Sequence, residues 1–183
     1  MAKTAILVPR QEMQLMAEQL IGQYQNLTPL CIEYIQTRDA ARRAAELEEQ
    51  GCDLIVARGL QAAIIKQTVH LPVVNIVITA QELGVLTLQL KQELGIIHPK
   101  IGLIGFENML SDTARFEELF DVEIVRYTIQ EYETKNTHTI LADFVTQAQR
   151  EGCNAVVGGD VVCAQAEAKG IIHRFFSSSL ESL

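Results

Sequence analysis

Two stretches of the chain, about a hundred residues apart, share one layout, and this internal repeat constrains the fold more than any other feature of the sequence. Each copy begins with Gly-Cys followed by Asp or Asn, at residues 51–53 and 152–154. Each copy then holds two short apolar runs with a helix-like segment between them. Each ends with a Thr-x-x-Glu or Ser-x-x-Glu motif, at residues 79–82 and 178–181. Two copies of one supersecondary layout predict two similar halves of the fold.

Short apolar runs alternate with helical segments along the whole chain. The expected strands are residues 5–8, 30–35, 53–57, 73–78, 100–105, 122–128, 155–157 and 171–176. The expected helices are residues 11–24, 38–50, 61–69, 82–94, 109–120, 131–151 and 161–169. Strands that are nearly all apolar and alternate with helices are typical of a parallel sheet covered on both faces. The sequence therefore predicts an α/β protein.

The repeat favours two similar parallel-sheet, three-layer lobes, residues 1–78 and 99–176, over one eight-stranded sheet, which is the alternative. A helix in residues 79–98 is expected to cross from the first lobe to the second. Residues 177–183 would begin a helix that returns to the first lobe. Because that helix is capped only a few residues before Leu183, we expect more protein to follow.

Composition argues against several classes of protein. The chain has 183 residues, of which 48% are hydrophobic and 21% charged, as in a soluble globular protein. A net charge of −8 repels nucleic acid and anionic membranes on average. No signal peptide or membrane-spanning apolar stretch is expected. Four cysteines without CxxC spacing fit reduced thiols in the cytosol: Cys31, Cys52, Cys153 and Cys163.

Ligands of open parallel sheets bind outside the carboxyl ends of the strands, and the residues expected there suit an anion. A guanidinium matches a carboxylate in bidentate geometry, which makes Arg58 the strongest candidate, although it could instead pair with a nearby acidic residue. The residues expected to bind a ligand in a cleft between the lobes are Arg10, Arg58, Gly59, Thr79, Gly158, Gly159 and Ser178. The glycines could serve only as tight turns, and Thr79 and Ser178 are helix N-caps first and ligand donors second.

A small-molecule enzyme of the aspartate/glutamate racemase type is the alternative function. Cys52 and Cys153 occupy equivalent places in the repeat, as opposed catalytic thiols would, but both precede their strands and so fall at the wrong edge of the sheet. No nucleophile with a base stands out, so no catalytic residue is expected. The four histidines show no metal-ligand spacing, and we expect neither a metal nor another cofactor.

Residues 51–59 and 71–82 resemble the N-terminal sensor domain of the propionate catabolism activators, which are bacterial sigma-54-dependent transcription factors. These residues read GCDLIVARG and LPVVNIVITAQE, against family patterns of D-x-I-x-x-R-G and P-V-V-x-I-x-V-S-G-x-D. Residues 155–177 are also similar. The chain departs from the pattern at Ala80, where the family tends to have Gly, and at Glu82, where it tends to have Asp; both changes are conservative for helix capping.

The resemblance implies a cytoplasmic effector-sensing domain with a flavodoxin-like or periplasmic-binding-protein-like bilobal fold. Its effector would be a small carboxylate such as 2-methylcitrate. Beyond Leu183, the family pattern implies an ATPase domain that engages sigma-54 RNA polymerase and a helix-turn-helix domain that binds DNA. A homo-oligomer without membrane contact is expected. Effector binding would change the closure of the lobes, and the crossing helices would carry that change to the ATPase domain.

Overall fold

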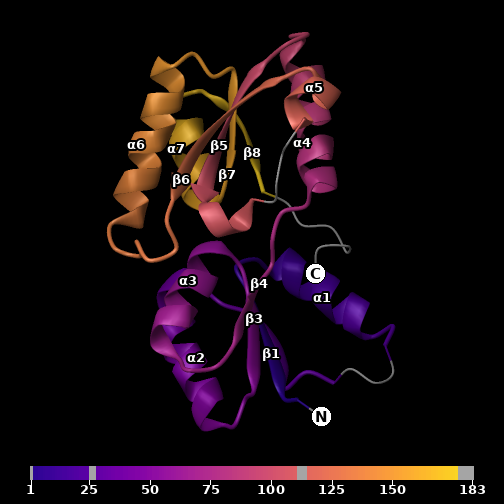
Figure 1. Ribbon diagram of the computed structural model, residues 1–183, viewed down its shortest axis with the longest axis vertical. Helices are drawn as coiled ribbons and strands as arrows, with labels where there is room; N and C mark the ends of the chain where they lie inside the picture. Colours follow the sequence, from indigo (N-terminus) through magenta and orange to yellow (C-terminus); the bar gives the residue numbers. More distant parts are fainter. Residues whose placement is uncertain (1, 25–27, 111–114, 177–183) are drawn as a thin grey trace. The chain divides into compact units, whose positions relative to one another are not determined.

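The computed structural model describes residues 2–24, 28–110 and 115–176, and the internal repeat appears in it as two α/β units (Figure 1). Among these residues, unit 1 takes in residues 2–77 and unit 2 takes in residues 78–176. The capping box expected at residues 178–181 lies outside the described residues.

Unit 1 is built on one four-stranded parallel sheet. Its elements are β1 (Thr4–Val8), α1 (Gln11–Ile21), β2 (Cys31–Tyr34), a 3₁₀ turn (Thr37–Asp39), α2 (Ala40–Glu49), β3 (Leu54–Ala57), α3 (Gly59–Thr68) and β4 (Val73–Asn75). The strand order is β2-β1-β3-β4 and every pair is parallel. The register places Ile6 beside Ile32 on one side and Val56 on the other.

Successive residues of β1 face opposite sides of this sheet, which gives unit 1 three layers. Ala5 and Leu7 pack in one apolar cluster with residues of α2 and α3. Ile6 and Val8 pack in a second cluster with Met13 of α1. Figure 1 shows α2 and α3 on one face of the sheet and α1 on the other. The part of a strand that is buried on both faces is expected to be apolar, as Ala5–Val8 of β1 are.

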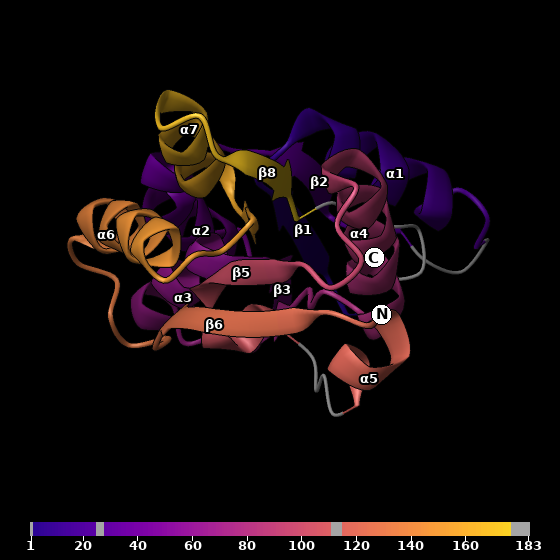
Figure 2. The same ribbon diagram turned by 90° about the horizontal axis from the view of Figure 1, so that it is seen from above.

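Unit 2 repeats this arrangement. Its elements are α4 (Ala80–Leu94), β5 (Lys100–Phe106), a 3₁₀ turn (Glu107–Met109), α5 (Phe116–Phe120), β6 (Glu123–Ile129), α6 (Thr137–Arg150), β7 (Ala155–Gly158), α7 (Asp160–Ala168) and β8 (Ile172–Phe175). The parallel strand order β6-β5-β7-β8 matches that of unit 1 strand for strand. Helices α6 and α7 lie on one face, and α4 and α5 on the other (Figures 1 and 2).

These two sheets confirm the predicted α/β fold of two similar parallel-sheet, three-layer lobes, and the alternative of one eight-stranded sheet is wrong. Equal strand order in both units is the structural counterpart of the sequence repeat. Each unit buries its own apolar strands, because helices cover both faces of each sheet.

Three predicted elements differ from the structure. Strand β4 ends at Asn75, and Ile78 forms only an isolated bridge to Leu110. The helix predicted over residues 109–120 is limited, among the described residues, to α5, since Arg115 just before it has a φ of 61°. The helix predicted from residue 131 begins at Thr137, since Asn136 has a φ of 57°. A residue in the left-handed conformation cannot continue a right-handed helix.

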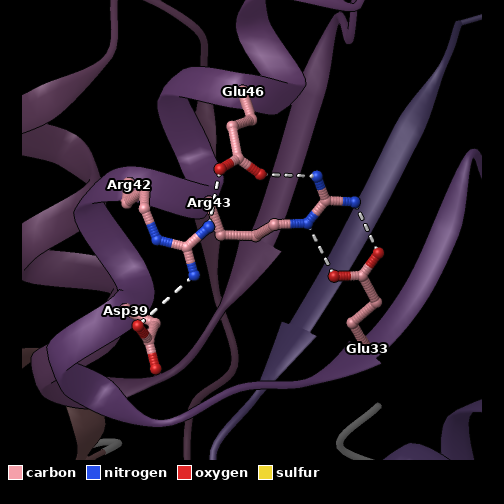
Figure 3. A network of polar contacts seen from close by, with 5 residues as sticks. All are labelled: Glu33, Asp39, Arg42, Arg43 and Glu46. Carbon is pink, nitrogen blue, oxygen red and sulfur yellow. Dashed lines mark hydrogen bonds and ion pairs between the residues drawn. The ribbon is translucent and has the colours of Figure 1, made fainter.

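A network of ion pairs fastens the edge strand β2 to α2 (Figure 3). Arg43 on α2 holds Glu33 on β2 in bidentate fashion, with Nε–Oε2 at 2.7 Å and Nη2–Oε1 at 2.6 Å. Its Nη1 donates to Oε2 of Glu46 at 3.1 Å, and Arg42 bonds the other Glu46 oxygen at 2.6 Å and Asp39 at 3.3 Å. These contacts position the outer strand of unit 1 against its helical layer.

Candidate ligand-binding site

The strand order of unit 1 brings two predicted site residues to neighbouring strand ends. Strand β1 lies beside β3, and the helices that follow them, α1 and α3, pack on opposite faces of the sheet. In doubly wound sheets, ligands bind outside the carboxyl ends of two strands at such a reversal. Arg10 follows β1 and Arg58 follows β3. The sequence placed both at strand ends, and the sheet order makes those strands adjacent.

The side chain of Arg58 is buried near these strand ends. It is 3% exposed, and its Nη1 lies 3.8 Å from Sδ of Met13. Met13 belongs to the first turn of α1, so the guanidinium extends from the β3–α3 turn to the start of the other helix. Charged side chains are almost never buried this fully unless a partner compensates the charge.

Helices α1 and α3 both begin at these strand ends with an arginine in the N-cap position. Arg10 and Arg58 have extended backbone angles there, and neither side chain makes a capping hydrogen bond. N-caps are ordinarily Ser, Thr, Asp or Asn, whose oxygens satisfy the free N–H groups of the first turn. The first turn of α1 contains Glu12, which is exposed, and the described first turn of α3 contains no acidic residue. Two positive helix ends, with the buried guanidinium of Arg58 beside them, favour an anion at this place.

Gly59 serves the turn from β3 into α3. Its φ is 54°, a conformation that favours glycine, and its N–H donates to Oδ1 of Asn75 at 3.2 Å. Asn75 is the last residue of β4, so this bond ties the start of α3 to the neighbouring strand end. The backbone N–H of Gly59 is therefore engaged within unit 1.

A residue that the sequence analysis did not single out, Gln61, reaches the same edge of the sheet. It is 1% exposed, and its Nε2 donates to the backbone oxygen of Ile35 at 2.8 Å. Ile35 follows β2 and its N–H donates to the backbone oxygen of Val8, the last residue of β1. In the sequence, Gln61 is an ordinary polar residue at a helix start; its burial comes from tertiary packing.

The predicted glycines of unit 2 have different surroundings. A Cβ on Gly158, the last residue of β7, would lie 2.5 Å from Cβ of Val162, so Gly158 allows α7 to pack on the strand end. A Cβ on Gly159 would meet nothing within 4 Å among the described residues. Packing thus accounts for Gly158, whereas Gly159 keeps open space at the start of α7.

The predicted capping box of α4 is present. Oγ1 of Thr79 accepts from the N–H of Glu82 at 3.2 Å, and Oε2 of Glu82 accepts from the N–H of Thr79 at 2.8 Å. The hydroxyl of Thr79 also donates to that carboxylate at 3.0 Å, so it is occupied in both roles. Ser178, the equivalent residue in the second copy, lies outside the described residues.

The cysteines considered for racemase chemistry lie at the amino-terminal edges of the sheets. Cys52 precedes β3 and is buried, with Sγ 3.2 Å from the backbone oxygens of Lys3 and Leu54. Cys153 precedes β7, and burial raises the pKa of its thiol, which disfavours the thiolate needed for proton transfer. Within the described ranges, no three His, Cys, Asp or Glu side chains gather as metal ligands would, and no helix is both long and apolar enough to cross a membrane.

Two four-stranded parallel sheets, each covered by helices on both faces, define the chain as an α/β protein of two similar lobes. The family model described as propionate catabolism activator matches residues 27–183. The chain belongs to this family and is a sensor domain of a transcriptional regulator, as the resemblance of residues 51–82 predicted.

Solved structures share the fold. An NtrC family transcriptional regulator from Clostridium acetobutylicum superposes with a TM-score of 0.74 at 20% identity, covering 99% of this chain and 90% of that one. An ABC domain in complex with L-Trp from Streptococcus pneumonia has a TM-score of 0.50 at 12% identity, covering 97% and 75%. Arylmalonate decarboxylase has a TM-score of 0.35, too low for a shared fold to follow. No match was found among curated protein sequences.

Proposed function

We propose that the chain senses a small carboxylate, which binds at the carboxyl ends of β1 and β3. The observation that carries this proposal is that two helices, α1 and α3, begin at neighbouring strand ends with an arginine in the N-cap position. The guanidinium of Arg58 would hold the carboxylate in bidentate geometry, and Arg10 would add a second positive charge. The first-turn N–H groups of the two helices would supply further donors.

Binding at this place would act as a regulatory signal through differential affinity. A ligand shifts a protein toward the state that it binds more tightly, and only by the difference in affinity between the two states. In a regulator of this family that carries an ATPase domain acting on sigma-54 RNA polymerase and a DNA-binding domain, that shift would control the ATPase domain. A cytoplasmic homo-oligomer fits this role. It stays a prediction that the other expected site residues, Gly59, Thr79, Gly158, Gly159 and Ser178, take part in binding. Closure of the two lobes on the ligand also stays a prediction.

Thermal unfolding with dicarboxylates and tricarboxylates tests the proposal. A ligand at a hundred times its Kd stabilises the folded state by about 2.7 kcal/mol, which raises the melting temperature by several degrees. Arg58→Met keeps most of the buried apolar stem and removes the charge, so we expect it to abolish the shift. Arg10→Met should weaken binding less, because Arg10 is only half-buried.

Arg42→Met is the matched control for this experiment. Arg42 is 65% exposed on α2, which packs on the opposite face of the sheet from α1, so its loss should leave the ligand-induced shift intact. Full retention of the shift in Arg58→Met, with a fold like that of the parent, would show that the carboxylate binds elsewhere.

The racemase alternative gains no support from the placement of the thiols. Cys52 and Cys153 lie at the amino ends of β3 and β7, whereas the arginines lie at the carboxyl ends of β1 and β3. Cys163 on α7 lies nearer a carboxyl edge, with Sγ 3.8 Å from the backbone oxygen of Gly158. We therefore advance the sensor function alone.

A further inference from the structure

The buried amide of Gln61 has one group that the described part of the chain does not satisfy. Its Nε2 donates to the backbone oxygen of Ile35 at 2.8 Å. Its Oε1 is buried and has no hydrogen-bond donor among the described residues. Rotating the amide by half a turn would place Oε1 against the oxygen of Ile35, so the bond to Ile35 fixes the orientation. A buried acceptor without a donor costs about 1–3 kcal/mol, and such a group calls for a partner.

The location of this amide connects it with the proposed ligand site. Gln61 belongs to the first turn of α3, which follows β3, while Ile35 follows β2. Strand β1 lies between β3 and β2 in the sheet, and its last residue, Val8, accepts from the N–H of Ile35. The side chain of Gln61 therefore reaches from the start of α3 past the carboxyl end of β1 to the end of β2, at the edge of the sheet where β1 and β3 lead into Arg10 and Arg58.

We propose that Gln61 is a specificity-determining residue, whose Oε1 accepts a hydrogen bond from a hydroxyl group of the carboxylate ligand. This inference rests on the proposed function and adds a role that the arginines cannot fill, because a guanidinium only donates hydrogen bonds. The arginines bind the negative charge, which all carboxylates share, and Gln61 distinguishes ligands that carry a donor. Since Oε1 is buried, its surrounding side chains must move slightly to admit the ligand hydroxyl.

Burial makes this discrimination strong. A site built to bond a hydroxyl rejects the analogue without it, because the protein group then stays buried and unpaired. The cost of about 1–3 kcal/mol for an unpaired acceptor corresponds to roughly a 5- to 150-fold difference in Kd. A hydroxyl bound in solvent would give a far smaller difference.

Isothermal titration of the 183-residue chain with matched acids tests the inference. The probes are citrate against propane-1,2,3-tricarboxylate and malate against succinate; the members of each pair carry the same number of carboxyl groups and differ by one hydroxyl. We expect the parent to bind the hydroxylated member of the fitting pair at least fivefold more tightly. Gln61→Met should bring the ratio close to one while binding of the non-hydroxylated acid persists.

Gln14→Met is the control variant. Gln14 is also a glutamine that bonds a residue of β2, accepting from the N–H of Tyr34 at 3.1 Å, but its Nε2 donates to Glu18 at 2.8 Å, so both of its amide groups have a partner within unit 1. It should keep the preference of the parent.

Equal Kd values for a matched pair that binds the parent would overturn the role of Gln61 alone, as expected if a fixed water molecule satisfies Oε1. The Kd values of a matched pair are compared on the parent protein alone. This comparison therefore tests the role of Gln61 even if Gln61→Met does not fold. A ratio unchanged in a folded Gln61→Met would overturn the role as well. Absence of binding for all four acids would instead overturn the proposed carboxylate site, and this inference with it.

Discussion

At the turn from β3 into α3, Arg58 and Gly59 have different roles: the glycine allows the backbone conformation of the turn, and the arginine provides a positive charge. Gly59 adopts a φ of 54° and bonds Asn75, which directs the chain sharply from the strand into the helix. Arg58, in an extended conformation, sends its side chain under the start of α1. The glycine shapes the turn, and the arginine supplies the charge that the turn places at the sheet edge.

Gly158 and Gly159 provide a residue-scale prediction, because they are adjacent and differ in their surroundings. Gly158→Ala would push a methyl group to within 2.5 Å of Val162, so we expect a loss of about 1–3 kcal/mol in the free energy of unfolding. Gly159→Ala meets open space at a negative φ and should change stability by less than about 0.5 kcal/mol. Urea denaturation of both variants measures the difference. Equal destabilisation by the two substitutions would contradict the packing role given to Gly158.

At the scale of elements, the contact between β2 and α2 depends on the bidentate pair of Arg43 and Glu33. The side chains are 20% and 31% exposed, so solvent screens this pair less than the exposed pairs of Arg42. The hydrogen bonds from Arg43 lower the pKa of Glu33 below its ordinary value of 4.5. A carboxyl group whose pKa is lower in the folded state stabilises the fold above its unfolded pKa, and this contribution is lost as the pH falls through the folded value.

This linkage predicts how the difference between the parent and Arg43→Met depends on pH. At neutral pH we expect Arg43→Met to lower the free energy of unfolding by about 1–2 kcal/mol. Below pH 4.5 the difference should shrink as Glu33 becomes protonated in both states of the parent. Urea denaturation between pH 7 and pH 3 measures it, and Arg42→Met should stay within about 0.5 kcal/mol of the parent. A difference that does not change with pH would mean that Arg43 acts through packing of its stem.

At the scale of the whole molecule, the fold consists of two units, and each unit has a sheet of its own. Leu7 is fully buried among residues of unit 1, and Leu103 is fully buried on β5 of unit 2. The two sheets share no strand. A substitution that loosens the packing of one unit should therefore destabilise that unit more than the other.

Truncation of each core in turn tests this division. Leu7→Ala and Leu103→Ala should each cost about 2–5 kcal/mol. In native-state hydrogen exchange, Leu7→Ala should speed exchange in β1 and β3 and leave β5 and β7 protected, and Leu103→Ala should do the reverse. Loss of protection in both sheets from either substitution would show that the units unfold together.

Much of the fold follows from local patterns, and the departures have identifiable causes. The short apolar runs and the repeat were enough to predict eight strands, their parallel direction and two lobes. The late start of α6 depends on the left-handed Asn136, which has no distinct sequence signal, because asparagine also occurs within helices. The early end of β4 depends on pairing with β3, whose last partner is Ala57 opposite Asn75.

The candidate site was predictable only in part. Arg10 and Arg58 could be named because each follows an apolar run, and strand ends are read from the chain directly. Gln61 could not, because its role comes from burial against Ile35, which is 26 residues away. The different surroundings of Gly158 and Gly159 could not be predicted either, because they depend on how α7 packs on β7.

The amino-acid sequence by itself determined the type and order of the elements, their duplication and the charged residues at the strand ends, because these follow from local periodicity and turn chemistry. The tertiary structure alone decided that β1 lies beside β3, that Arg58 reaches α1 and that the amide of Gln61 is enclosed at the same edge. Strand neighbours and burial are set by contacts between distant parts of the chain, and short-range sequence patterns carry no record of those contacts.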